Sequence, residues 1–314
     1  MANKGSEFHE KLVENLSKVI VGKEDVLSLL ITSMVAGGHV LLEDVPGTGK
    51  TKLAKALAKS FDLQFSRIQF TPDLLPTDVT GLNVYDPKTG EFVMKKGPVF
   101  TNILLADEIN RATPRTQAGL LEVMEERQVT IDGQTFLPGD PFFVIATQNP
   151  VETAGTFPLP EAQLDRFMMK LSVGFPAHEE EINILLKYMD SDPLDTLTSV
   201  VTGEELEAVR KEAAAVHVSS AMLDYVVRMT SSTRKNNDVL MGVSPRGTLA
   251  LMHAAKARAC LLGRNFMIPD DVKAVAQAVL IHRIILGYGK SQDCDKFIQS
   301  VVKDTVVPTE DFEK

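Results

Sequence analysis

Hydrophobic and polar residues follow two different patterns along the chain, and the change between them falls near Ala177. Before that point, the apolar runs Val40–Leu42, Ile103–Ala106 and Phe142–Ala146 are typical of strands buried on both faces. The segment Leu63–Phe70 alternates as a half-buried strand does. Stretches with helical spacing separate these runs, so the pattern predicts an α/β fold with a parallel sheet covered by helices.

Helical spacing also governs both ends of the chain. Residues Phe8–Val35 predict two helices joined at Gly22. After residue 177, strand signals nearly vanish and helix caps take their place. Thr202 and Glu205 form a capping box at the start of one predicted helix. Ser244-Pro245 marks the start of a second helix, and Pro269 marks the start of a third. We therefore expect an α/β domain at 1–176 and an all-helical domain at 177–314.

Two insertions interrupt the α/β rhythm. In the first, at about 71–100, the turn Asp86–Gly90 lies between two alternating runs. In the second, at about 128–136, Asp132-Gly133 is a strong hairpin signal. Both are predicted to be hairpins added to the core.

Composition narrows the classes of function. With 314 residues, 44% of them apolar, the chain is long enough for about two domains with sizeable cores. A net charge of −9 excludes an overall electrostatic footprint for nucleic acid or an anionic membrane. The chain has two cysteines, no secretory signal pattern and no apolar stretch long enough to span a bilayer. We expect plain thiols, a cytoplasmic location and no membrane anchor.

A glycine-spaced turn follows the first predicted strand. The residues Pro46, Gly47, Thr48, Gly49, Lys50, Thr51 and Lys52 lead into a helix, as in a loop that cradles nucleotide phosphates. Lys50 would neutralise phosphate and Thr51 would hold Mg²⁺. The general pattern has glycine where this chain has Asp44, and the alternative is an ordinary glycine-rich turn.

Two acids end the next buried strand. Asp107 would hold the metal, usually through water, while Glu108 would activate the attacking water. The alternative is a structural role as strand-end acids near the helix that Thr113-Pro114 begins. A phosphate loop upstream favours the catalytic interpretation.

Two further polar residues follow along the chain. Asn149 ends a third buried strand, where its amide can hydrogen-bond the γ-phosphate and the water, although strand-end asparagines also cap turns. Arg166, on a short polar helix, can donate to charge developing on a γ-phosphate. A salt bridge with Asp165 or Glu161 is its alternative.

Together, these segments resemble the AAA+ ATPases, and within them the MoxR group. The resemblance covers nearly the whole chain and includes the loop that begins with Asp44. Its strongest motifs are Leu42–Thr51, Arg67–Pro76, Ala106–Ala112, Ile145–Pro150 and Pro158–Phe167.

The resemblance implies roles for individual residues. Asn149 matches sensor 1, Arg166 the arginine finger and Arg246 the sensor 2 arginine of a helical lid. Val21 and Gly22 match the place where such proteins wrap the adenine. The two hairpins match the helix-2 insert and the pre-sensor 1 hairpin. Because an arginine finger acts across a subunit boundary, a homo-oligomeric ring is implied, with a hexamer expected; whether Arg246 acts on its own or on a neighbour's nucleotide stays open.

The expected function is therefore Mg²⁺-dependent ATP hydrolysis that drives chaperone-like remodelling of a partner protein. By analogy, this is maturation or metal-cofactor insertion alongside a von Willebrand factor A domain protein. One alternative is a nucleic-acid motor, with Lys88, Lys95 and Lys96 on the first insert as its only local support. Another is a nucleotide-gated scaffold.

Overall fold

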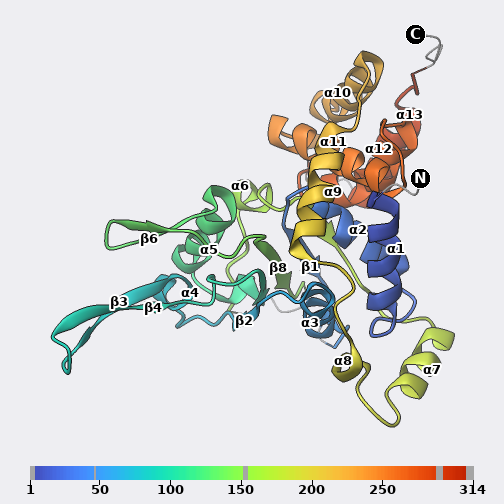
Figure 1. Ribbon diagram of the computed structural model, residues 1–314. Coiled ribbons are helices and arrows are strands. Elements are labelled where there is room, and N and C mark those ends of the chain that lie inside the picture. The colour runs from blue at the N-terminus through green and yellow to red at the C-terminus, as the bar shows by residue number, and fades with distance from the viewer. Residues whose placement is uncertain (1–3, 46, 151–154, 288–292, 309–314) are drawn as a thin grey trace.

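A computed structural model describes residues 4–45, 47–150, 155–287 and 293–308 (Figure 1). Its centre is a parallel five-stranded sheet in the order β2-β5-β8-β1-β9. The strands are β1 (Val40–Glu43), β2 (Phe65–Gln69), β5 (Ile103–Asp107), β8 (Phe143–Gln148) and β9 (Met169–Leu171). The predicted α/β class is confirmed, and so are four of the five strands.

Successive residues of the central strands enter two different hydrophobic cores. Leu105 and Ile145 belong to one core, while their neighbours Leu104 and Ala146 belong to the other. This is the consequence of a pleated strand, in which alternate side chains point to opposite faces. Burial on both faces explains why these strands are continuous apolar runs.

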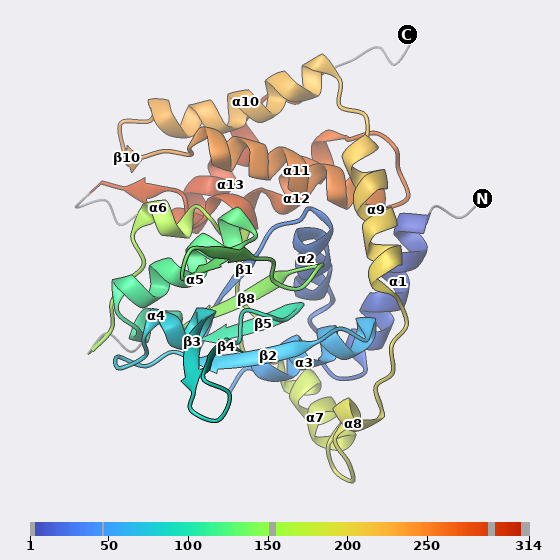
Figure 2. The same ribbon diagram turned by 60° about the vertical axis from the view of Figure 1, so that its left-hand side comes forward.

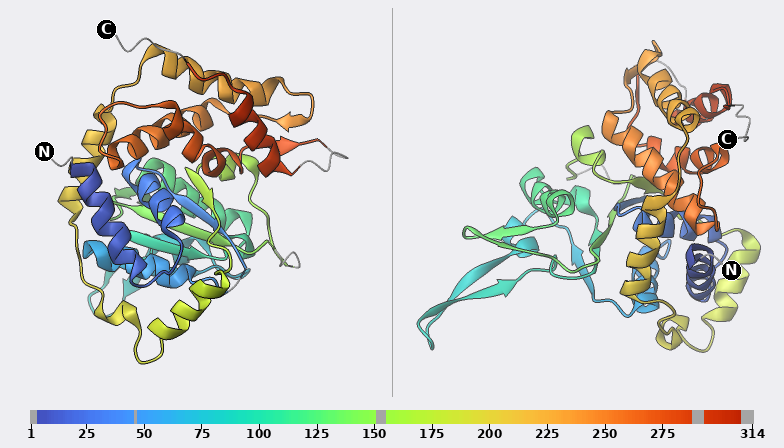
Figure 3. Two further views of the ribbon diagram at one scale, coloured as in Figure 1. Left: turned by 90° about the vertical axis from the view of Figure 1, so that its right-hand side faces the viewer. Right: turned by 45° about the horizontal axis from the view of Figure 1, so that its top comes forward.

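Helices cover both faces of the sheet and form a separate layer above it (Figures 1 and 2). Figure 3 shows the first two helices across one face. In chain order the helices are α1 (Lys4–Ser17), α2 (Glu24–Val35), α3 (Lys50–Phe61), α4 (Pro76–Thr80), the 3₁₀ helix η1 (Ile109–Arg111), α5 (Pro114–Glu126), α6 (Glu161–Leu164), α7 (His178–Lys187), α8 (Pro193–Thr196), α9 (Gly203–Ala215), α10 (Ser220–Lys235), α11 (Pro245–Leu261), α12 (Pro269–Leu280) and α13 (Cys294–Asp304). Within the described residues, none is long and apolar enough to cross a membrane.

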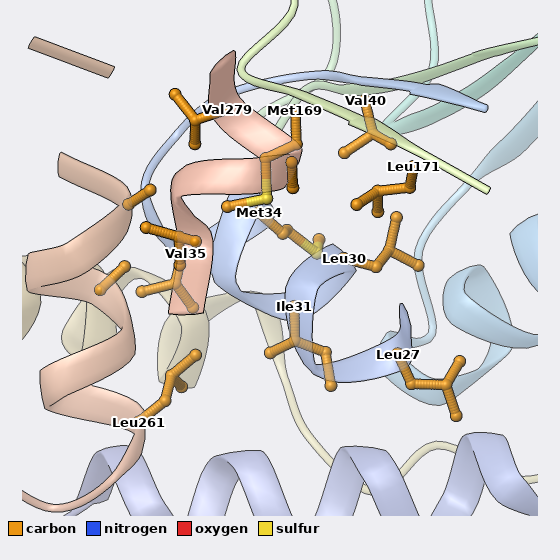
Figure 4. Packing of buried hydrophobic residues seen from close by; sticks show 14 of the residues in the cluster. Leu27, Leu30, Ile31, Met34, Val35, Val40, Met169, Leu171, Leu261 and Val279 are labelled. Atoms are coloured by element: carbon orange, nitrogen blue, oxygen red, sulfur yellow. The ribbon is translucent and has the colours of Figure 1, made fainter. Parts of the chain in front are cut away.

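Helix α2 packs between the sheet and the C-terminal helices. Figure 4 shows Met34 and Leu30 beside Met169 and Leu171 of β9, while Val35 lies toward Val279 of α12. All of these side chains are buried in the same core. The two halves of the chain therefore share one continuous hydrophobic core.

Both predicted hairpins form. The first is β3 (Gly81–Asp86) with β4 (Glu91–Lys96), which projects far from the body of the molecule (Figure 1). The second is β6 (Val129–Ile131) with β7 (Gln134–Phe136). Its two turn residues have positive φ, 48° at Asp132 and 80° at Gly133, as a tight Asp-Gly hairpin turn requires.

The C-terminal half is a helical lid with the predicted caps. The capping box at α9 is complete, because the Glu205 N–H donates to the Thr202 hydroxyl and the Thr202 N–H donates to the Glu205 carboxylate. Ser244 caps α11 by accepting from the Gly247 N–H. The lid also holds one short antiparallel pair that the pattern did not predict, β10 (Val239–Met241) with β11 (Ile285–Leu286). Both cysteines are free thiols, as expected.

Candidate nucleotide site

The glycine-spaced turn forms an open loop between β1 and α3. Gly47 and Gly49 have φ of 90° and 87°, and no described heavy atom lies within 4 Å of a Cβ built on either. These positions leave the backbone at the N-terminus of α3 open to an anion. The Lys50 ammonium donates to the Asp44 carbonyl oxygen at 2.9 Å, so it lies over the same loop. Pro46, which we predicted to contact nucleotide, lies outside the described residues.

A cavity of about 490 Å³ lies among lid residues and a larger one, of about 830 Å³, opens beside this loop. The larger cavity brings together residues from the ends of neighbouring strands of the sheet. It is lined by the predicted residues Val21, Gly47, Thr48, Gly49, Lys50, Thr51, Lys52, Asp107, Glu108 and Asn149. The structure thus brings residues more than 100 positions apart together at one edge of the sheet. The polar groups that converge in this larger cavity mark it as the candidate site.

The acid pair at the end of β5 is held by a threonine from β8. The Thr147 hydroxyl donates to Asp107 Oδ1 at 2.6 Å and accepts from the Glu108 N–H at 2.8 Å. Glu108 itself has φ of 55°, a left-handed conformation that is uncommon outside glycine. This sharp change of direction separates the two carboxylates, so that each can have a different function.

Both carboxylates contact residues of β2 whose function the sequence did not reveal. Arg67 lies 2.6 Å from Asp107 Oδ2, and the Gln69 amide donates to Glu108 at 2.8 Å. Arg111 also pairs with Glu108, at 3.0 Å. Both β2 residues lie in the motif Arg67–Pro76 that carries the family resemblance. Their positions two residues apart place them on the same face of the strand, and this spacing was the only sign in the sequence that they act together. The contacts place a cation on each acid.

The opposite end of the cavity is formed by the joint before α2 and by α7. Val21 and Lys23 line it together with Phe175 and Tyr188. Gly22 does not line the cavity among the described residues; its φ is 68°, and an added Cβ would meet the Glu180 side chain. Sequence reasoning missed the cavity-lining residues of α7, because that helix lies in the half assigned to the lid.

Lys52 is held beside the cavity by residues that follow α7. Its ammonium lies 3.0 Å from Asp192 and 3.6 Å from the centre of the Tyr188 ring. Partial burial disfavours the ammonium, but hydrogen bonds to Asp192 and Tyr188 and the negative charge of Asp192 outweigh it and raise the pKa of Lys52. Lys52 thereby fastens the segment after α7 to the helix that follows the phosphate loop.

Arg166 and Arg246 lie together at a different place. The Arg166 Nε is 2.8 Å from Glu125 Oε2, and Arg246 pairs with the other oxygen of the same carboxylate. Neither arginine is among the described residues that line the cavity. Figures 1 and 2 show α6, which precedes Arg166, well separated from α7, with the sheet between them. The structure therefore does not bring the two arginines to the chain's own phosphate loop.

Comparison with known proteins agrees with this arrangement. Residues 39–169 match the ATPase family associated with various cellular activities (AAA), and residues 231–305 match the AAA lid domain. The chain is 51% identical to the uncharacterized protein YeaC of Bacillus subtilis, over 88% of this chain and 86% of that one. It is 44% identical to the chaperone MoxR1 of Mycobacterium tuberculosis, over 90% of this chain and 77% of that one.

The fold also matches a solved structure. A crystal structure of a protein from Cytophaga hutchinsonii superposes with a TM-score of 0.88 at 37% identity, covering 98% of this chain and 97% of that one. Together with the phosphate loop, the strand-end acids and the helical lid, these relatives confirm the resemblance found in the sequence. The chain belongs to the MoxR family of AAA+ ATPases.

Proposed function

We propose that this protein hydrolyses ATP with Mg²⁺ at the cavity between the phosphate loop and α7. The observation that carries the proposal is the convergence of Lys50, Thr51, Asp107, Glu108 and Asn149 on one cavity at the carboxyl edge of the sheet. Ligands of open α/β sheets bind at this edge. A cavity of about 830 Å³ is large enough for a nucleotide.

The residues present fit a magnesium ion held between protein and phosphates. Gly47 and Gly49 leave an open cradle for the phosphates, and Thr51 and Asp107 supply the hard oxygen ligands that Mg²⁺ prefers. When bound, the ion would neutralise phosphate charge. Glu108 would accept a proton from the attacking water, and Asn149 would orient that water.

We infer that the arginines act on a neighbouring subunit. Arg166 and Arg246 share Glu125 at a place separated from their own cavity. Guanidinium groups stabilise charge on a transferred phosphoryl group when they reach it. A closed ring, expected to be a hexamer, would place the pair against the nucleotide of the next subunit.

The client is proposed to be a protein, remodelled in a chaperone-like way. The projecting β3–β4 hairpin exposes apolar side chains along its length, with Phe92 72% exposed and Tyr85 53% exposed. Exposed apolar surface of this kind favours a protein partner over the nucleic acid suggested by Lys88, Lys95 and Lys96. By analogy with the family, the partner includes a von Willebrand factor A domain protein, and the process is maturation or metal-cofactor insertion.

The two free cysteine thiols of this protein support the proposal that it works in a reducing, cytoplasmic location.

The test is phosphate release by the Glu108→Gln variant. We expect turnover to fall about 100-fold or more because the general base is lost. Binding of a fluorescent ATP analogue should persist, and removal of Mg²⁺ should abolish turnover of the unchanged protein. Glu122→Gln, an exposed acid on α5, is the matched control. Magnesium-independent release, or full activity in Glu108→Gln, would refute the proposal.

The same variant identifies the client. In ATP, Glu108→Gln should retain a partner protein that wild type releases, because its ring stays in the ATP state. A remodelling enzyme should also lose its product in this variant. A nucleotide-gated scaffold would instead hold its partner without any product being lost.

A further inference from the structure

Arg283, a buried arginine of the lid, donates hydrogen bonds to residues on both sides of Arg166. It lies between α12 and β11 and is only 3% exposed. Its Nε donates to Asp165 Oδ1 at 2.6 Å, and its two terminal nitrogens donate to the carbonyl oxygens of Asp165, Phe167 and Met168. A further bond goes to the Val279 carbonyl oxygen of α12, the helix that precedes Arg283.

These contacts use the whole donor capacity of the side chain. A guanidinium has five N–H donors in a fixed fork, and Arg283 makes five hydrogen bonds. Four of them reach residues 165–168, which include Arg166. His282 adds another from the lid, since its Nε2 donates to the Phe167 carbonyl oxygen at 3.0 Å. Residues 165–168 are therefore fixed to the lid by its buried side chains.

The same hydrogen-bond network reaches the helix turn that carries Arg246. The second oxygen of the Asp165 carboxylate accepts from the Ser244 hydroxyl at 2.7 Å, and Ser244 is the N-cap of α11, whose first turn carries Arg246. Gly247 permits the close approach, because an added Cβ would lie 2.7 Å from Arg283 Cδ. One buried side chain thus fixes the backbone beneath both arginines that pair with Glu125.

We infer that Arg283 is a positioning residue that holds Arg166 and Arg246 in one unit for presentation to the nucleotide of a neighbouring subunit. This inference rests on the proposed action in trans. Because the unit includes both the lid and residues 165–168, movement of the lid carries both arginines with it. Without the hydrogen bonds of Arg283, the segment that carries Arg166 and the helix that carries Arg246 could move apart.

The test uses two inactive full-length variants that restore each other. Glu108→Gln subunits retain their arginines, and Arg166→Ala subunits retain their catalytic acids, so mixed rings should regain ATP hydrolysis. Arg283→Ala is then added to one type of subunit at a time. In the Glu108→Gln subunit, which donates the arginines, it should lower the restored kcat at least tenfold while KM changes less than twofold. In the Arg166→Ala subunit it should leave the restored rate within twofold.

Two further variants separate positioning from folding. Arg264→Ala removes another lid arginine, which pairs with Asp271 at 2.5 and 2.6 Å, and its effect should be the same in either subunit. Arg283→Lys, which keeps the charge but loses the fork, should give an intermediate rate in the donor subunit. Equal loss from either placement of Arg283→Ala, or no loss from either, would overturn the positioning role alone. Failure of the parent mixture to regain activity would overturn the action in trans and the positioning role with it.

Discussion

The backbone N–H of Val173 donates to the carboxylate of Asp44 at 2.8 Å, which ties the first residue of the phosphate loop to the chain just after β9. The same carboxylate accepts from the Ser172 hydroxyl at 2.7 Å and from the Gly174 N–H at 3.0 Å. Asp44 is buried, so these three donors satisfy its charge. The residue that departs from the general phosphate-loop pattern therefore anchors the loop to the wall of the cavity.

The first prediction concerns the replacement of Asp44 by the glycine of the general pattern. Asp44→Gly should lower the free energy of unfolding by about 3 kcal/mol, because it removes charged hydrogen bonds and leaves buried N–H groups without an acceptor. Urea denaturation measures this change. Asp44→Asn keeps one acceptor oxygen and should show a smaller loss. A stability unchanged in Asp44→Gly would mean that these bonds contribute nothing net.

The second prediction concerns the cation beside Asp107, the acid that we propose as a magnesium ligand. Arg67 occupies one oxygen of Asp107, so a bound metal competes with it for negative charge. A partly exposed ion pair contributes up to about 1 kcal/mol, so Arg67→Ala should lower the Mg²⁺ concentration for half-maximal ATP hydrolysis about threefold. The measurement is a Mg²⁺ titration at saturating ATP. Arg115→Ala, an exposed arginine on α5, is the control, and a rise in the Mg²⁺ requirement would contradict the argument.

The third prediction concerns the carboxylate that Arg166 and Arg246 share. Without the charge of Glu125, the two guanidinium groups repel each other, so the pair is no longer held together for the proposed contact with a neighbour's phosphate. Glu125→Gln should lower kcat for ATP about tenfold and leave KM within twofold. Steady-state phosphate release at several protein concentrations measures both. Glu126→Gln changes the adjacent exposed acid and should behave as wild type; equal losses in both variants would argue against a specific role.

Much of the fold could be predicted because its strongest determinants are local. Ile103–Ala106 is apolar throughout because its strand is buried on both faces, and Asp132-Gly133 forms a turn that few other residues allow. The strand β9 escaped prediction because the three residues Met169–Leu171 are too short to show a pattern. The domain boundary at residue 176 stays a prediction, although α7 beyond it lines the nucleotide cavity.

The candidate site shows the same division between local and distant information. Lys50, Asp107 and Glu108 follow apolar strands at recognisable spacing, so the phosphate loop and the acids could be found. Glu125 and Arg283 could not, because each acts through partners 41 to 121 positions away, such as Arg166, and no local pattern records such a pairing. Charged residues in helices and turns look alike in a sequence whether they face solvent or pair with a charged residue far along the chain.

The fourth prediction concerns acid stability and rests on two buried histidines. Burial, together with the positive charge of Arg127, lowers the pKa of His39 to about 3, and burial with the charge of Arg283 lowers the pKa of His282. The unfolded chain binds these protons below pH 6.5 and the folded chain does not. The contribution of the two neutral histidines to folding stability is therefore fully present above that pH and is lost as the pH falls toward 3. At pH 5.5 each histidine should cost about 1.4 kcal/mol relative to pH 7.5. Urea denaturation at the two pH values measures the stability lost on acidification. This loss should be smaller by that amount in His282→Gln, which keeps a donor for the Phe167 carbonyl oxygen. His178→Gln changes an exposed histidine and serves as the control, in which the loss should stay as in wild type. An unchanged loss in His282→Gln would show that this histidine is protonated in the folded protein.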